Sequence, residues 1–197
     1  IIVLLINLIT TPTFFRITIN NGVLYGYIID VINRASELVV LAVGMTLVVS
    51  ASAGTDISVG AVMAVAAAVC TRVLAGGEVS VNEYANPYVL AVLAALAAAV
   101  VCGGFNGLLV AKLKIQPMVA TLILFTAGRG ISQLVTNGQI TYIRVDGYKL
   151  LGNNIPGIPI PTPIFVAVIV VALTYILLKK TAMGMYIQSV GINERAS

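Results

Sequence analysis

The sequence predicts an all-α protein, a polytopic bundle of membrane helices with about six spans and a broken or re-entrant helix near residues 53–60. Composition predicts this fold class. Hydrophobic residues make up 59% of the chain and charged residues only 9%, whereas roughly a quarter of the residues of a soluble domain are charged. The mean hydropathy is +1.06, and a chain this apolar would expose aggregating patches in water. The expected solvent is therefore a lipid bilayer.

Six apolar segments approach the length of about 20 residues that a helix needs to cross a bilayer. They are rich in Ala and Gly, which let helix backbones approach closely and favour a packed bundle. We expect a single transmembrane domain over residues 1–197, which is the N-terminal part of a longer protein. The expected spans are 1–11, 38–53, 57–75, 88–111, 117–136 and 164–178.

Basic residues in short loops predict which way the spans face, because such loops stay in the cytoplasm. The turn 76–87 contains two glutamates and is expected outside, together with the proline-rich loop 137–163, which is either a rigid connector or a docking surface. Residues 12–37 also lie outside if 38–53 and 57–75 are two full crossings, which we favour over one re-entrant element. Two basic turns are expected in the cytoplasm. One contains Lys112 and Lys114, and the other contains Lys179 and Lys180.

The stretch SASAGTDISVGAV, residues 50–62, places polar residues in one of the most apolar parts of the chain. Gly54 permits a break in a helix, and Thr55, Asp56 or Ser58 is suited to cap the helix that follows. A helix that restarts here would aim its N-terminal N–H groups at a substrate, as broken helices do in transporters. The alternative is a tight cytoplasmic turn with Asp56 exposed.

Two further polar residues interrupt apolar segments. Arg129 lies about 18 Å along its helix from Pro117, where a charge needs a partner, a water-filled cavity or a route to the outer surface. Since a lone charge is costly in lipid, we hypothesise that Asp56 and Arg129 neutralise each other. Asn106 is surrounded by glycines, which favours close helix packing with an interhelical hydrogen bond over a ligand contact.

Several chemistries are not indicated. The chain has no histidine, and Cys70 and Cys102 lie inside apolar segments, where buried inert thiols are expected. We find no nucleotide-binding loop, metal-ligand cluster, nucleophile motif or basic run for nucleic acid. A membrane enzyme stays possible, although no motif indicates a reaction, and we expect no catalytic residue, metal site or cofactor in the chain.

Two stretches carry a resemblance to a known family. GMTLVVSASAGTDISVGAVMAV and GFNGLLVAKLKIQPMVATLILFTAGRG resemble the membrane permeases of bacterial sugar ATP-binding-cassette (ABC) importers, the ribose, galactose and galactofuranose group. Within that group the chain looks most like galactofuranose permeases. It departs from the family signature at Ala53-Gly54-Thr55, where two glycines usually precede the Ile-Asp or Leu-Asp pair. The similarity covers nearly the whole chain.

The resemblance implies a multi-pass permease of the bacterial inner membrane that imports a monosaccharide by alternating access. Its expected partners are cytoplasmic ATP-binding subunits, a second permease subunit (a copy or a sister chain) and a periplasmic sugar-binding protein, and ATP binds the partner subunit. The family pattern places a cytoplasmic coupling helix in residues 184–197. The coupling residues would be Gly184, Tyr186, Ile187, Val190, Gly191, Asn193, Glu194 and Arg195. The candidate pathway residues are Asp56, Ser58, Asn106, Thr121, Arg129 and Gln133.

Other functions compete with this one. A branched-chain amino acid or nucleoside ABC permease would have the same architecture, and a zwitterionic substrate would require a fixed charge such as Arg129. An ATP-independent transporter or channel would need no coupling helix. A purely structural membrane subunit is disfavoured by polar residues such as Asp56 inside the apolar segments.

Overall fold

The computed structural model describes residues 6, 14–20, 23–52, 54–145, 147–148, 152 and 158–192. The chain divides into two compact units, each described here by itself. One unit combines Ile1–Gly44 with Asp146–Gly184, and the other combines Met45–Val145 with Met185–Ser197. The assignment of the whole chain to a single domain stays a prediction.

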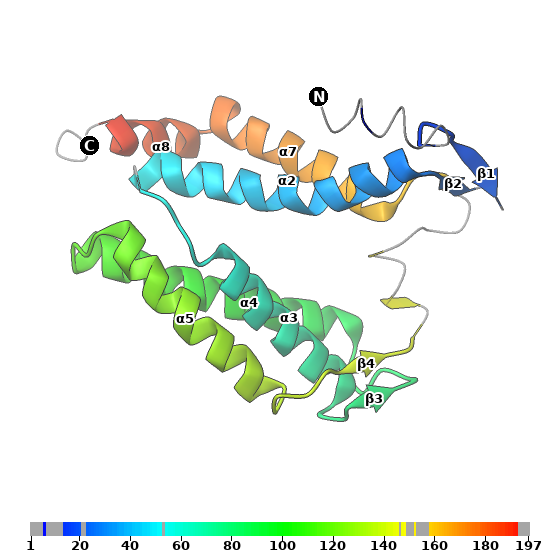
Figure 1. Ribbon diagram of the computed structural model, residues 1–197. Helices are drawn as coiled ribbons and strands as arrows, with labels where there is room; N and C mark the ends of the chain where they lie inside the picture. Colours follow the sequence, from blue (N-terminus) through cyan, green and yellow to red (C-terminus); the bar gives the residue numbers. More distant parts are fainter. Residues whose placement is uncertain are drawn as a thin grey trace. The chain divides into compact units, whose positions relative to one another are not determined.

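Three helices form the centre of the second unit: α3 (Val59–Ala75), α4 (Tyr88–Gly107) and α5 (Pro117–Val135). α3 packs against both α4 and α5, as Figure 1 shows, while α4 and α5 contact each other less. Small residues permit this close packing. The buried residues where the three helices meet are Val65, Cys102 and Leu124, one from each helix.

A tight turn joins α4 to α5 at one end of this unit. α4 continues into a five-residue π-helical turn, η1 (Leu108–Lys112), and Lys114 adopts a left-handed conformation with φ of 54°. Pro117 then occupies the first turn of α5, where its missing N–H costs no helical hydrogen bond. This end, which carries Lys112 and Lys114, is called the lysine end below.

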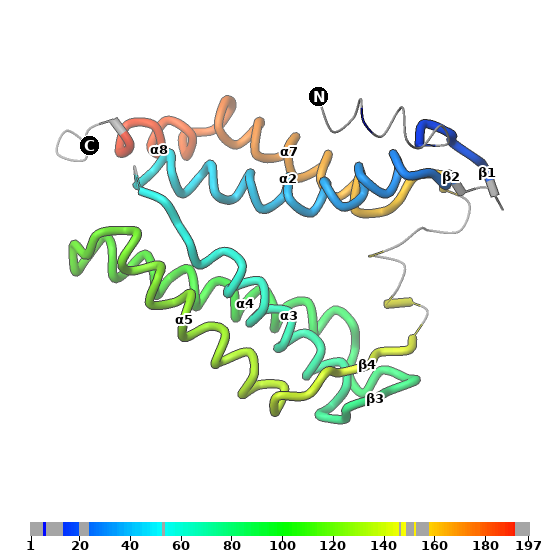
Figure 2. Tube along the Cα trace, in the orientation of Figure 1, coloured from blue at the N-terminus to red at the C-terminus, as the bar shows by residue number. Residues whose placement is uncertain are grey.

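At the opposite end of the unit, the two loops predicted to share one side of the membrane lie together. β3 (Ser80–Val81) pairs in parallel with β4 (Tyr142–Ile143), as the trace in Figure 2 shows. The turn 76–87 begins at Gly76, whose φ of 59° ends α3 in the left-handed region that glycine adopts without strain. This placement agrees with the predicted alternation of the spans. The sequence did not predict the short strands, because a two-residue strand leaves no periodicity to detect.

The described part of the first unit contains a short hairpin and helical segments. β1 (Thr18–Asn20) pairs antiparallel with β2 (Val23–Tyr25), and α2 (Tyr27–Ser52) continues from this unit into the second. The unit also contains all of α7 (Thr162–Lys180) and the start of α8 (Ala182–Ile192).

The expected spans are largely confirmed within the described residues. Four helices are long and apolar enough to cross a membrane, namely α2, α4 with η1, α5 and α7, and α3 is a shorter apolar helix. The expected first span, 1–11, lies almost wholly outside the described residues. The predicted start of the second span at Leu38 is wrong, because α2 begins at Tyr27.

The structure also bears on the choice between two crossings and one re-entrant element. α3 runs from the lysine end of its unit to the β3–β4 end, beside α4 and α5. α2 is 26 residues long, about 39 Å at 1.5 Å per residue, which exceeds the ~30 Å hydrocarbon thickness. α3 is shorter, at 17 residues, so the choice between two crossings and one re-entrant element stays a prediction.

Candidate functional site

The helix break predicted near residues 53–60 is present. α2 ends at Ser52, α3 begins at Val59, and residues 54–58 are not helical (Figure 2). The Asp56 carboxylate oxygen Oδ1 accepts hydrogen bonds from the backbone N–H and the hydroxyl of Ser58, both at 2.7 Å. The N-cap residue of α3 is Ser58, which has no capping hydrogen bond from its own side chain. Asp56 therefore forms an Asx turn that leads into α3, and its negative charge lies near the positive end of the helix dipole.

Side-chain hydrogen bonds tie this break to both neighbouring helices. The Asn106 side-chain N–H of α4 donates to the Ser58 hydroxyl oxygen at 2.8 Å. The Ile57 backbone N–H donates to the Thr121 hydroxyl of α5 at 3.2 Å. Four of the six predicted pathway residues, Asp56, Ser58, Asn106 and Thr121, are thus brought together.

Gly54 shows how closely the break approaches α5. A Cβ added at Gly54 would lie 2.5 Å from the Pro117 Cβ and Cγ atoms, closer than any real carbon contact. Glycine is therefore required here for space, since only a residue without a side chain fits against the proline ring. The unusual Ala-Gly-Thr sequence of this signature keeps the glycine that makes the contact.

The depth of Asp56 follows from its neighbours. Thr121 lies four residues after Pro117, about 6 Å along α5, and Asn106 lies six residues before Lys112, about 9 Å along α4. The break is therefore one to two helical turns inside the lysine end. Asp56 is half-buried and hydrogen-bonded, which argues against the alternative of an exposed surface turn.

A cavity of about 680 Å³ opens beside the break, within the second unit. This volume lies in the range of ligand sites, roughly 300–1,000 Å³. Asp56, Asn106 and Thr121 line it. Ser58 is fully buried and does not line the cavity, but it donates hydrogen bonds to the Asp56 carboxylate. The remaining polar or charged lining residues are Ser52, Thr55, Lys114 and Gln116. Sequence reasoning missed these four, although all flank helix ends beside the break or the lysine turn.

Asn106 is 8% exposed, and its side-chain oxygen is buried with no hydrogen-bond partner among the described residues. Its N–H is used by Ser58, so both predicted features of Asn106 are present: it forms an interhelical hydrogen bond, and it lines the cavity. An unpaired buried oxygen is costly, and since Asn106 lines the cavity, this oxygen could accept a hydrogen bond from a solute there.

The hypothesis that Asp56 and Arg129 neutralise each other is wrong. No ion pair joins them in the part of the chain that the structure describes. Arg129 is exposed, and its guanidinium lies over the Phe125 ring of the same helix, 4.4 Å from the centroid. The physical reason is distance along α5: Arg129 lies eight residues beyond Thr121, about 12 Å further from the break.

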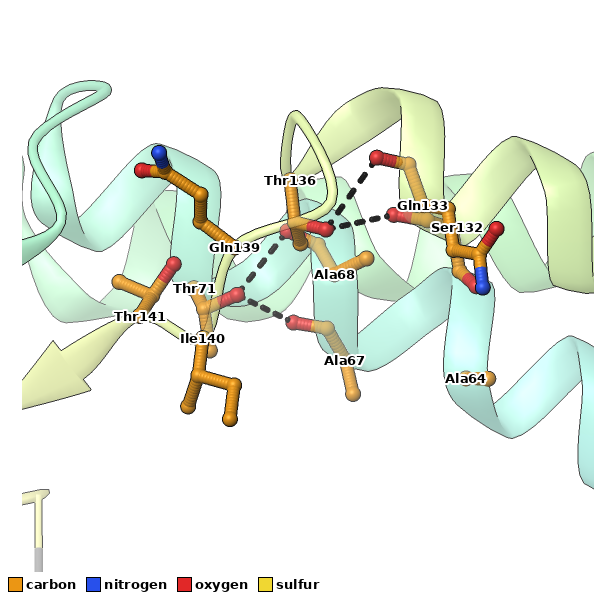
Figure 3. A pocket seen from close by; sticks show the side chains of 10 residues that line it. All are labelled: Ala64, Ala67, Ala68, Thr71, Ser132, Gln133, Thr136, Gln139, Ile140 and Thr141. Atoms are coloured by element: carbon orange, nitrogen blue, oxygen red, sulfur yellow. Dashed lines mark hydrogen bonds between the residues drawn. The ribbon is translucent and has the colours of Figure 1, made fainter.

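Gln133 lies further still along α5 and is also separate from the break. It lines a smaller hollow of about 260 Å³ towards the β3–β4 end (Figure 3). The six predicted pathway residues therefore fall into a cluster of four at the break, and two at greater distance. A place on the transport path stays a prediction for all six.

The structure explains the two glycines of the predicted coupling helix, α8. A Cβ at Gly184 would collide with the backbone of Leu178 in α7, and a Cβ at Gly191 would collide with the Ser50 carbonyl of α2. Tyr186 is largely exposed.

The other predicted coupling residues differ in their burial and in whether the structure describes them. Ile187 is half-buried, while Val190 is exposed and lines the cavity beside the break together with Gly191. Asn193, Glu194 and Arg195 lie outside the described residues.

The chain matches a known family over most of its length. The family described as branched-chain amino acid transport system / permease component matches residues 27–197. The chain belongs to this family. With its apolar helices, it is a multi-pass protein of the bacterial inner membrane.

Named relatives refine this assignment. The chain is 44% identical to the galactofuranose transporter permease protein YtfT of Escherichia coli K12 over 196 residues, which cover all of this chain and 54% of the relative. It is 40% identical to the fructose import permease protein FruF of Bifidobacterium longum over 185 residues, 90% of this chain and 48% of the relative. Identity to the ribose import permease protein RbsC of E. coli K12 is 33% over 202 residues, all of this chain and 57% of the relative.

These matches confirm the resemblance to sugar permeases. The chain spans about half the length of the curated relatives it matches. No solved structure matches it.

Proposed function

We propose that this chain is the membrane subunit of an ATP-driven importer that carries a monosaccharide, galactofuranose or a similar sugar, across the bacterial inner membrane by alternating access. The observation that carries the proposal is the cavity beside the helix break, lined by Asp56, Asn106 and Thr121, in a chain whose named relatives are galactofuranose, fructose and ribose permeases.

The chemistry of the cavity supports a neutral, hydroxyl-rich substrate. Hydroxyl groups of Ser52 and Thr55 and the amide of Gln116 line it, and such groups both donate and accept hydrogen bonds, as sugar hydroxyls do. The two charged lining residues, Asp56 and Lys114, are of opposite sign. One carboxylate oxygen of Asp56 already accepts two hydrogen bonds from Ser58. The main contribution of Asp56 is therefore to stabilise the non-helical segment 54–58.

The energy source and partners belong to the same proposal. ATP is hydrolysed on cytoplasmic partner subunits, so this chain needs no cofactor, and α8 presents Tyr186 and Val190 to them. A second permease subunit completes the pathway, and a periplasmic binding protein delivers the sugar. Closure of the ATP-binding subunits moves α8, whose Gly191 abuts Ser50 at the end of α2, and this links ATP hydrolysis to the wall of the cavity.

Uptake by the full-length permease tests this function. Vesicles that contain the permease pair, the ATP-binding subunits and the binding protein are given radiolabelled galactofuranose, fructose, ribose and leucine. We expect ATP-dependent accumulation of at least one sugar and none of leucine. Accumulation of leucine alone, or uptake that does not require ATP, would contradict the proposal.

A further inference from the structure

The hollow of about 260 Å³ that Gln133 lines, called the outer hollow below, differs chemically from the cavity at the break. It lies between the last turns of α3 and α5 and the chain that leads to β4, within the second unit. Its lining contains no charged residue, and six of its ten residues have a hydroxyl or amide side chain. Its volume, about 260 Å³, is close to the lower limit of ligand sites.

Two hydroxyl groups of this hollow, those of Thr71 and Thr136, already donate their protons to backbone carbonyls. The Thr71 hydroxyl donates to the carbonyls of Ala67 and Ala68, and the Thr136 hydroxyl donates to the carbonyl of Ser132. Figure 3 shows these bonds on one side of each oxygen. Because a hydroxyl oxygen has two lone pairs, Thr71 and Thr136 still offer acceptors to a solute in the hollow.

Two glutamine side chains supply the hydrogen-bond donors that Thr71 and Thr136 do not offer to a solute. Gln133 and Gln139 line the hollow, and each amide carries two N–H donors and one acceptor. In Figure 3 the Gln133 amide lies on the side of Ala64 and the Gln139 amide lies beside Thr141, with Thr71 and Thr136 between them. Both amides are exposed, so a solute in the hollow can reach them.

An apolar floor completes the hollow. Ala64, Ala67 and Ala68 of α3 form one wall and Ile140 contributes an exposed side chain. Sugars combine an apolar C–H face with a rim of hydroxyls that donate and accept. A small apolar surface ringed by amides and hydroxyl acceptors, without charge, matches that pattern and disfavours anions and cations.

We propose that this hollow is a second, outer binding subsite for a neutral monosaccharide, which the sugar occupies before it reaches the cavity at the break. The inference rests on the proposed function, because it assumes that sugar enters from the end opposite Lys112 and Lys114. Gln133 lies about 18 Å along α5 from Thr121, which separates the two sites by more than half of the ~30 Å hydrocarbon thickness. Gln133 and Gln139 are its specificity residues.

The experiment is protection of an introduced thiol in the full-length permease assembled with its partners in vesicles. Ile140→Cys places a reactive group in the hollow, and Thr141→Cys is the second choice. A membrane-impermeant maleimide is applied with or without galactofuranose, fructose or ribose, and sucrose serves as the oversized control. The parent protein, with native Cys70 and Cys102, sets the background.

We expect at least one monosaccharide to slow labelling and sucrose to have no effect. Gln133→Leu and Gln139→Leu in the same background should each weaken protection about three- to tenfold, the equivalent of one lost hydrogen bond. Thr126→Leu, an exposed polar-to-apolar change on α5 outside the hollow, should leave protection unchanged.

The failure of this inference is distinguishable from failure of the proposed function. Sugar uptake by the unmodified permease without any protection at Ile140→Cys or Thr141→Cys overturns the subsite alone. Equal protection by sucrose, or protection that persists in both glutamine variants, also overturns it. Absence of sugar uptake by the unmodified permease overturns the proposed function.

Discussion

At its first turn α3 is joined to both neighbouring helices by polar groups, whereas at its last turn the polar side chains bond within α3 or to the adjoining turn. Ser58 receives a hydrogen bond from Asn106, and Ile57 donates to Thr121. At the far end, Thr71 bonds to carbonyls of its own helix and Arg72 to the carbonyl of Gly77.

This difference has a mechanical consequence. Interhelical hydrogen bonds in a membrane fix the rotation and register of the helices they join. Bonds within a helix leave its neighbours free to shift. We therefore expect side-chain hydrogen bonds between the helices to fix the α3–α4–α5 packing at the lysine end. At the other end the connection runs through the loops, where Asn86 bonds the Val73 carbonyl and β3 pairs with β4.

The largest effect on stability is expected at Gly54, where no space is left for a side chain. Gly54→Ala should destabilise the permease by about 1–3 kcal/mol, the usual cost of overpacking, because its Cβ would collide with Pro117. Gly60→Ala is the matched control, since nothing lies within 4 Å of its Cβ and alanine is the better helix former. Thermal unfolding of the purified full-length protein measures both. Equal destabilisation by the two variants would remove the steric explanation.

The hydrogen bonds that Asp56 accepts from Ser58 should give the next effect. Asp56→Ala removes this acceptor, and a hydrogen bond of this kind contributes about 0.5–1.5 kcal/mol. Asp56→Asn keeps an acceptor and should retain most of the stability and most of the sugar uptake. The same unfolding and uptake assays compare the two variants. If Asp56→Asn is as damaging as Asp56→Ala, the negative charge acts in a way that these hydrogen bonds do not explain.

The contrast between the two ends of α3 is tested by a matched pair of polar-to-apolar changes. Asn106→Leu removes an interhelical bond, which averages about 0.6 kcal/mol in membranes and reaches about 1.7. Thr71→Val removes only bonds within α3, so its effect on the free energy of unfolding should be close to zero. A Thr71→Val cost equal to that of Asn106→Leu would mean that both ends are held alike.

The smallest effect is an expected absence of coupling between Asp56 and Arg129. Because no ion pair joins them, Asp56→Asn and Arg129→Gln should change stability additively, within about 0.5 kcal/mol, as independent sites do. Arg129→Gln alone should cost about 0.5–1 kcal/mol through the lost contact with the Phe125 ring. A double-mutant cycle with a coupling energy above 1 kcal/mol would restore the ion pair that the structure lacks.

Hydropathy predicted the helices of this chain better than their boundaries. α2 extends back to Tyr27 although its charged residues lower the local hydropathy. Arg34 and Glu37 are good helix formers, and Asp30 lies in the first turn, where the helix dipole favours a negative charge. The break at 54–58 was predicted from Gly54 and the capping residues, which act locally.

Contacts between helices were harder to predict. Residue spacing gives position along a helix, so Asp56, Ser58, Asn106 and Thr121 could be named as pathway candidates. It does not give the level at which one helix meets another, which is why Arg129 was paired with Asp56 incorrectly. Lys114 and Gln116 were missed as cavity residues for the same reason, since only the fold brings their turn beside the break.

The central claim is that the helix break lines the sugar pathway near the cytoplasmic surface, and cysteine labelling at Thr55 tests it most directly. Thr55 is exposed and lines the cavity, and Ser189→Cys on α8 is exposed but lines no part of it. In inside-out vesicles with the assembled importer, Thr55→Cys should react with a membrane-impermeant maleimide, and a transported sugar should slow the reaction while Ser189→Cys is unaffected. Labelling of Thr55→Cys that requires access from the opposite face, or that the transported sugar does not change, would contradict the claim.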